Sequence, residues 1–62
     1  MVYGNLYMKA TDESSGKVCD LECTCVKSND INDRIEEMIE YGKNELESTD
    51  NILFKFEYEV YG

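Results

Sequence analysis

Three thiols are the side chains of this sequence with the most distinctive potential chemistry, because a group of cysteine thiolates can bind zinc. Cys19, Cys23 and Cys25 follow a C-x3-C-x-C spacing, which is not that of a zinc knuckle. On an extended strand, the first and last of these thiols lie about 20 Å apart at ~3.3 Å per residue. We therefore interpret them as small hydrophobic core residues and expect no metal site and no cofactor. A metal-binding regulator is the alternative, which predicts stoichiometric zinc in the purified protein and folding that depends on the cysteines.

Groups that usually carry catalysis are scarce. The sequence contains no histidine, which is the commonest general base and zinc ligand, and no glycine-rich phosphate loop or dinucleotide fingerprint. Residues 29–37 (NDINDRIEE) bring a calcium-binding loop to mind, but they lack its turn glycine and place Arg34 where an oxygen ligand is needed. The sequence therefore predicts no enzymatic activity and no catalytic residue.

Acidic side chains dominate the composition. The chain has 62 residues, with fourteen Asp and Glu against six Lys and Arg, and its formal net charge is −8. This charge opposes binding to nucleic acid or to an anionic membrane, and it favours a basic protein surface as the partner. Solubility alone is the competing explanation. Where the acids lie on the surface distinguishes binding to a basic partner from solubility alone.

The sequence also carries information on compartment. It does not begin with a basic segment followed by an apolar run, and no stretch approaches the ~20 apolar residues of a membrane span. The three cysteines are an odd number, which fits free thiols in a reducing compartment better than a disulfide framework. We expect a cytoplasmic protein.

The spacing of apolar residues divides the chain into strands and a helix. Apolar and polar residues alternate in residues 2–10, 18–26 and 52–60, which predicts three strands. Residues 11–17 are mostly small and polar and predict a hairpin connection. From residues 31 to 47, apolar residues recur at three- and four-residue spacing, which predicts an amphipathic helix of about four turns.

The ends of this helix and its single glycine need separate treatment. Residues 28–30 (Ser-Asn-Asp) are all competent N-caps. Gly42 is able to end the helix, but Leu46 returns to the apolar stripe. We therefore expect the helix to continue to about Glu47, with Gly42 letting it lie close to the sheet.

The order of the elements predicts an α+β fold. We expect a single β-β-α-β domain over residues 1–62, with a three-stranded antiparallel sheet in the order 2-1-3 and the helix packed on one face. A chain of this length buries only a thin core. Alternation assigns the following strand residues to the inner face: Val2, Leu6, Met8, Ala10, Cys19, Leu21, Cys23, Cys25, Ile52, Phe54, Phe56, Tyr58 and Val60.

Acids of the predicted helix gather opposite its apolar stripe, at about 100° per residue. We call them the carboxylate ridge, and its members are Asp33, Glu36, Glu37, Glu40 and Glu47. Five carboxylates along roughly 21 Å of helix axis give one per ~4 Å, comparable with the ~3.4 Å spacing of charges on one DNA strand. Arg34 and Lys43 lie at its margins and offer little compensation. The ridge fits either a solvated helix face or a surface that binds a basic partner.

The uncovered sheet face is the second candidate surface. We expect it to carry Tyr3, Tyr7, Asp20, Glu22, Glu57, Glu59 and Tyr61, together with Lys9, Lys55 and Leu53. Tyrosines with acidic neighbours suit a partner rich in Arg and Lys, although cross-strand pairing in a solvated sheet explains them equally. The second and third strands are sheet edges, so pairing between copies is also open.

In size and charge the whole chain resembles small acidic inhibitors encoded by phages, among them anti-CRISPR and anti-restriction proteins that mimic DNA, and inhibitors of host polymerases or repair enzymes. The carboxylate ridge and the acidic sheet face carry this resemblance, and no sequence motif does. It implies an inhibitor in the host cell cytoplasm that occupies a basic, nucleic-acid-binding surface of a target protein, without touching nucleic acid or membrane itself. The alternative is a structural or assembly subunit, or a homodimer, that pairs through its sheet face or edge strands.

Overall fold

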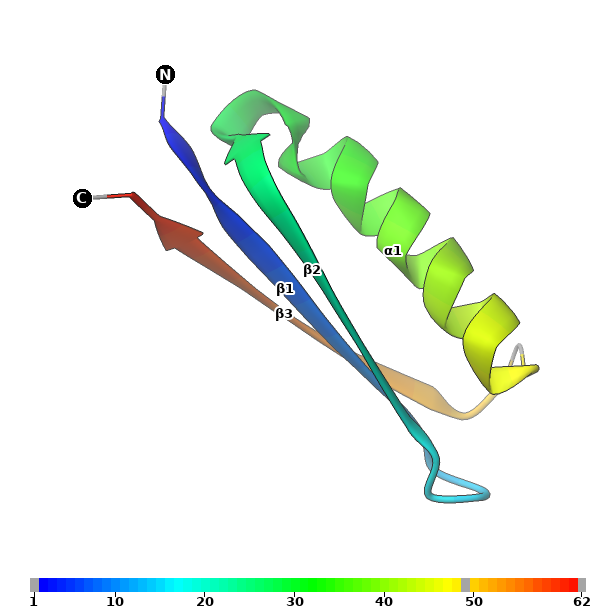
Figure 1. The fold of residues 1–62 in the computed structure, drawn as a ribbon. Helices are drawn as coiled ribbons and strands as arrows, with labels where there is room; N and C mark the ends of the chain where they lie inside the picture. Colours follow the sequence, from blue (N-terminus) through cyan, green and yellow to red (C-terminus); the bar gives the residue numbers. More distant parts are fainter. Residues whose placement is uncertain (1, 49, 62) are drawn as a thin grey trace.

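Three strands and one helix form the structure. The computed structural model describes residues 2–48 and 50–61. Its elements are β1 (Tyr3–Asp12), β2 (Val18–Lys27), the short 3-10 turn η1 (Ser28–Asp30), α1 (Ile31–Leu46) and β3 (Ile52–Val60). The sheet is antiparallel in the order β2-β1-β3, and α1 lies on one of its faces (Figure 1). This confirms the predicted α+β fold with its β-β-α-β order.

A tight turn joins β1 to β2, as the small polar residues predicted. The Asp12 N–H donates to the Lys17 carbonyl at 2.8 Å, and the Gly16 N–H donates to the Asp12 carbonyl at 2.7 Å. Gly16 has a φ of +79°, which glycine adopts without steric cost. The Asp12 carboxylate of this buried residue accepts a hydrogen bond from the Ser14 N–H at 2.9 Å, which stabilises the turn.

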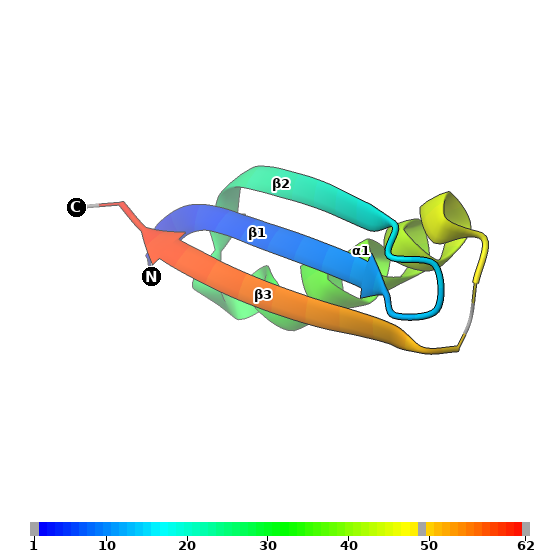
Figure 2. The same cartoon turned by 90° about the horizontal axis from the view of Figure 1, so that it is seen from below.

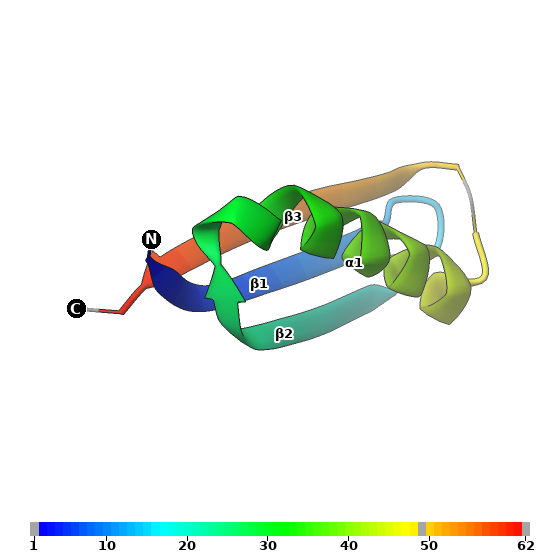
Figure 3. The same ribbon diagram turned by 90° about the horizontal axis from the view of Figure 1, so that it is seen from above.

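The core lies between the central strand and the helix. Leu6, Met8 and Ala10 of β1 are 1%, 2% and 0% exposed, because strands flank them on both sides and α1 covers them (Figure 3). Met38 and Leu46 are their buried counterparts on the helix. Apart from the buried Val26 of β2, the apolar residues that point toward the helix from the two edge strands are only half-buried. The core is therefore one strand wide.

The helix approaches the sheet most closely at Gly42. A Cβ atom at this position would lie 2.8 Å from Cε1 of Phe54 and 3.3 Å from Cβ of Ala10. The helix runs through Gly42 and ends at Leu46, which confirms its predicted continuation. At the other end, Asp30 occupies the N-cap position, but its side chain makes no capping bond. The turn η1 leads into the helix instead, so the predicted side-chain cap is wrong for Asp30.

A β-bulge in β2 overturns the predicted orientation of Cys25. Leu6 pairs with Cys23 and Gly4 with Val26, so β2 has one residue more than β1 in this interval. Cys25 takes a left-handed φ of 55° and is exposed, while Val26 takes the inner position and is 4% exposed. The extra residue reverses the alternation on which the prediction rested.

Two further residues that alternation assigned to the inner face are not buried. Val2 is 45% exposed and Val60 is 49% exposed. Val60 pairs with Gly4, which has no side chain to cover it. The ring of Tyr58 occupies that space instead, because a Cβ on Gly4 would lie 2.9 Å from its Cζ atom. The Tyr58 hydroxyl donates to the Val26 carbonyl at 2.7 Å and so ties β3 to the bulged end of β2 across β1.

Candidate protein-interaction surfaces

All five side chains of the carboxylate ridge are exposed. Four of them lie in α1, as the helical spacing predicted, whereas Glu47 directly follows the last residue of α1. Arg34 donates from Nη1 to Oε2 of Glu37 at 2.7 Å, and this is the one ion pair within residues 2–48 and 50–61. Glu37 raises the pKa of Arg34 through this hydrogen bond and its charge. The remaining ridge carboxylates have no basic side chain within ion-pairing distance in that part of the chain. The ridge therefore presents mainly uncompensated negative charge.

Glu45 adds negative charge on the flank of α1 that faces β2, and the sequence analysis did not single it out. Glu45 raises the pKa of the Tyr41 hydroxyl and contributes, after burial, to raising that of the Cys19 thiol. Glu45 could have been found from the sequence, because on a helical wheel it lies between the carboxylate ridge and the apolar stripe. The acidic surface of the helix is thus wider than the five ridge residues.

The helix ends in a Schellman motif in which an acid occupies the position usually taken by glycine. Glu47 has a φ of 52°, and its N–H donates to the Asn44 carbonyl at 3.3 Å. The Ser48 N–H donates to the Lys43 carbonyl at 3.2 Å, which completes the motif. A left-handed backbone disfavours a residue with a Cβ, and a carboxylate is unfavourable at the negative end of the helix dipole. Glu47 therefore lowers the stability of the domain through both its backbone conformation and its charge.

We expect Glu47→Gly to raise the free energy of unfolding by about 1 kcal/mol, because glycine adopts the left-handed conformation freely and removes the charge. Urea denaturation followed by circular dichroism measures this change. Glu47→Gln is the matched control, since it removes the charge and keeps the Cβ, and we expect it to recover less than half of the gain. A Glu47→Gly variant no more stable than the parent would contradict this account of the helix end.

The second predicted surface lies on the sheet face that no element covers (Figure 2). The structure places the predicted side chains Tyr3, Tyr7, Asp20, Glu22, Glu57, Glu59 and Tyr61 there, all exposed except the half-buried Tyr7. Tyr7 stands opposite Glu22 of β2 and Glu57 of β3 in the strand register. An open hollow of about 630 Å³ surrounds it. The outward residues that line the hollow are Tyr7, Lys9, Asp20, Glu22, Lys55 and Glu57.

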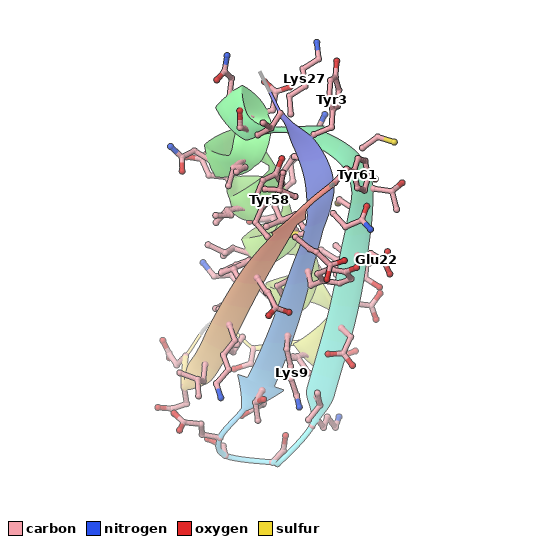
Figure 4. The ribbon with its side chains drawn as sticks, turned by 90° about the vertical axis from the view of Figure 1, so that its left-hand side faces the viewer. Tyr3, Lys9, Glu22, Lys27, Tyr58 and Tyr61 are labelled. Carbon is pink, nitrogen blue, oxygen red and sulfur yellow. The ribbon has the colours of Figure 1, made fainter. Side chains whose placement is uncertain are left out.

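Two lysines make this face less uniformly acidic than the ridge. Lys9, labelled in Figure 4, pairs with Asp20 of β2 on one side and with Lys55 of β3 on the other, so two lysines are direct cross-strand neighbours on this face. Like charges directly opposite on neighbouring strands destabilise the pair. The face therefore has mixed charge, and Lys55 lacks an acidic cross-strand partner on β1.

The Tyr61 hydroxyl is engaged within the molecule. It accepts a bond from the Cys25 N–H at 3.0 Å and donates to Oδ1 of Asn5 at 2.6 Å. Nδ2 of Asn5 in turn donates to the Tyr7 hydroxyl at 3.3 Å. The N–H bond from Cys25 alone would lower the pKa of Tyr61, but the Cys25 thiol, burial and Tyr7 outweigh it and raise that pKa. Tyr61 thus ties the end of β3 to the bulge, a role the sequence analysis did not foresee.

The twelve predicted partner-binding residues therefore fall on two surfaces that face away from each other. The carboxylate ridge lies on the outer side of the helix layer, and the seven strand residues lie on the far side of the sheet (Figures 1 and 2). A single flat partner surface contacts one set or the other. The sequence alone left open which of the two surfaces binds a partner.

The three thiols do not come together. Cys19 and Cys23 are half-buried on the helix side of β2, whereas Cys25 is exposed beside Tyr61 on the opposite side. Among the residues that the structure describes, no three His, Cys, Asp or Glu side chains are grouped so that they could hold a metal ion. In the same residues, no helix has the length and apolar character needed to cross a membrane.

Comparison with known proteins gives no assignment for either surface. No protein-family model, curated protein or solved structure matches the chain.

Proposed function

We propose that this protein is a small inhibitor that binds a basic, nucleic-acid-binding surface of another protein through its carboxylate ridge. The supporting observation is the row of exposed carboxylates on α1, in which only Glu37 is paired with a cation among the described residues. Their spacing of one charge per ~4 Å along the helix approaches that of phosphates on a nucleic acid strand. A protein surface that binds the phosphates of a nucleic acid strand carries Lys and Arg side chains at a spacing that matches those phosphates, and so approximately matches the ridge.

Solubility alone accounts poorly for where these acids lie. Negative charge anywhere on the surface keeps a small domain soluble, and acids stabilise a helix only in its first turn. Here Glu45 and Glu47 stand at the C-terminal end of α1, where carboxylates oppose the helix dipole. Glu47 also adopts a left-handed backbone. Placement that lowers stability favours a binding role for these acids.

The ridge is a better candidate than the open sheet face for a basic target. The sheet face carries Lys9 and Lys55 at its centre, and these would repel Lys and Arg of the target. The Tyr61 hydroxyl on that face already makes hydrogen bonds to Asn5 and Cys25, so it is less able to bond to a target. In this mechanism the helix takes the place of one nucleic acid strand, and long-range attraction between opposite charges speeds its association with the target.

The test begins with a target captured on the immobilised protein from lysate of the native host, identified by mass spectrometry and purified. We expect its affinity to fall at least about tenfold between ~0.05 M and ~0.5 M salt, because the attraction is between exposed charges. Nucleic acid bound by the same target should compete with the protein. Isothermal titration calorimetry measures both effects.

Three double charge reversals, each changing the net charge equally, then locate the binding surface. Glu36→Lys with Glu40→Lys alters the ridge and should weaken binding at least about tenfold. Glu57→Lys with Glu59→Lys alters the sheet face, and Glu13→Lys with Asp50→Lys alters exposed loop positions. Both of these pairs should weaken binding no more than about threefold, through net charge alone. Indifference of the affinity to salt and to the ridge reversals would exclude the proposal.

A further inference from the structure

Within residues 2–48 and 50–61, β3 pairs with β1 alone, so its other edge has no strand beside it. The Tyr61 N–H donates to the Tyr3 carbonyl and the Glu13 N–H donates to the Asn51 carbonyl, so odd-numbered residues of β3 bond to β1. The backbone N–H and C=O groups of the even-numbered residues therefore point to the free edge. A row of such groups is a template for another strand.

This edge carries charged side chains but lacks two other features that block strand addition, proline and a β-bulge. The chain contains no proline, and the register between β1 and β3 has no bulge. The other edge strand, β2, is interrupted by the bulge at Cys25. Beside the free edge of β3, the side chains of Phe54, Phe56 and Tyr58 are only half-buried, and Val60 is 49% exposed. Apolar surface thus flanks the unpaired backbone.

We infer that β3 pairs antiparallel with β3 of a second copy of this chain, about a twofold axis at Phe56, so that two sheets become one sheet of six strands. Even-numbered residues then face even-numbered residues and exchange about ten backbone hydrogen bonds. Phe54 faces the second copy's Tyr58 on the helix side of the sheet. On the open side, Lys55 faces the second copy's Glu57, and the twofold axis repeats both contacts.

The charges of β3 select this register among its neighbours. An axis at Lys55 would set Lys55 against Lys55, and an axis at Glu57 would set Glu57 against Glu57. An axis between two residues would pair even-numbered with odd-numbered residues, whose backbone groups already bond to β1. Among these registers, only the axis at Phe56 brings opposite charges together and satisfies the free backbone groups.

The pairing also resolves the unfavourable position of Lys55. Within one copy, Lys55 has Lys9 directly opposite on β1. In the dimer, the second copy's Glu57 lies on its other side, in a pair without backbone hydrogen bonds, where side chains approach most closely. Leu53, which is 47% exposed in one copy, then faces the aliphatic part of the second copy's Glu59.

Sedimentation equilibrium at ~0.15 M salt tests this inference. An interface made of one strand edge and its apolar flank is small, so we expect a micromolar dissociation constant. The protein concentration should therefore range from about 10 µM to about 1 mM. Lys55→Glu and Glu57→Lys each place like charges opposite each other, and each should raise the dissociation constant at least about tenfold. The double variant K55E/E57K restores opposite charges in exchanged positions and should recover parental dimerisation. Glu59→Lys is the control, because it makes the same charge reversal as Glu57→Lys at a residue that faces the uncharged Leu53 of the second copy. It should change the dissociation constant of the dimer by no more than about threefold.

Three outcomes would overturn the inference: a monomer throughout the concentration range, a dimer unaffected by both single variants, or a double variant as weak as the single ones. Far-UV circular dichroism establishes that each variant is folded before it is compared. The dimer does not depend on the proposed inhibitor function, because Glu36→Lys with Glu40→Lys lies on the helix layer and should leave dimerisation unchanged. Failure of one proposal is therefore distinguishable from failure of the other.

Discussion

A Gly4→Ala variant is expected to lose about 3 kcal/mol of its free energy of unfolding. A Cβ atom on residue 4 would lie 2.4 Å from the backbone carbonyl oxygen of Glu59 and 2.9 Å from Cζ of Tyr58. Neither neighbour yields easily, because Glu59 is paired with β1 and the Tyr58 hydroxyl is bonded to the Val26 carbonyl. A domain of this length has a total stability of only roughly 3–9 kcal/mol. The substitution should therefore remove at least about a third of the stability, and nearly all of it at the lower end of this range.

Gly16→Ala is the control for this variant, because it also adds one methyl group to a glycine. Residue 16 has a φ of +79°, but no atom lies within 4 Å of a Cβ placed there. We expect a loss of about 1–2 kcal/mol from the left-handed backbone alone. Urea denaturation of both variants gives the comparison. A smaller loss at residue 4 than at residue 16 would show that β1 and β3 are not packed as described.

A Gly42→Leu variant is expected to lose about 3 kcal/mol or more, because α1 and the sheet leave no space for a side chain at residue 42. Even a Cβ atom there would lie 2.8 Å from the Phe54 ring and 3.3 Å from Cβ of Ala10. Helix propensity acts in the opposite direction, since leucine in an isolated helix is more favourable than glycine by somewhat under 1 kcal/mol. A net loss of stability would therefore report packing against the sheet, and thermal unfolding measures it.

Asn44→Leu introduces the same residue on the exposed side of α1. There the helix propensity of leucine is not opposed by packing, and we expect a gain of a few tenths of a kcal/mol. Gly42→Ala is the intermediate step, in which the propensity gain of about 1 kcal/mol partly offsets the contact with Phe54. Equal stabilities of the Gly42→Leu and Asn44→Leu variants would rule out the close helix–sheet contact.

The sequence was sufficient to predict the elements and their arrangement because each is encoded locally. Alternation with a period of two and the change to helical spacing after Lys27 located the three strands and α1. The continuation of the helix through Gly42 followed from the return of Leu46 to the apolar stripe. The exposure of the carboxylate ridge followed from helical geometry alone.

What the sequence could not predict depends on contacts between distant residues. The bulge at Cys25 requires a left-handed backbone at a residue other than glycine, and the only local signal is that the apolar Val26 follows it directly. The bonds that Tyr58 and Tyr61 make across the sheet join residues more than thirty positions apart. The Arg34–Glu37 ion pair is the exception, because its three-residue spacing on a helix made it predictable.

The strand order has a consequence for folding during synthesis. The central strand β1 is the first strand to leave the ribosome, yet one of its two neighbours, β3, is the last. Pairs such as Gly4 with Val60 close a loop that contains nearly the whole chain, and closing such loops is slow compared with forming the hairpin of β1 and β2. Until β3 emerges, the nascent chain exposes an unpaired edge of the strand that is most deeply buried in the folded protein. Chaperones that bind extended apolar segments therefore have their best target in this interval.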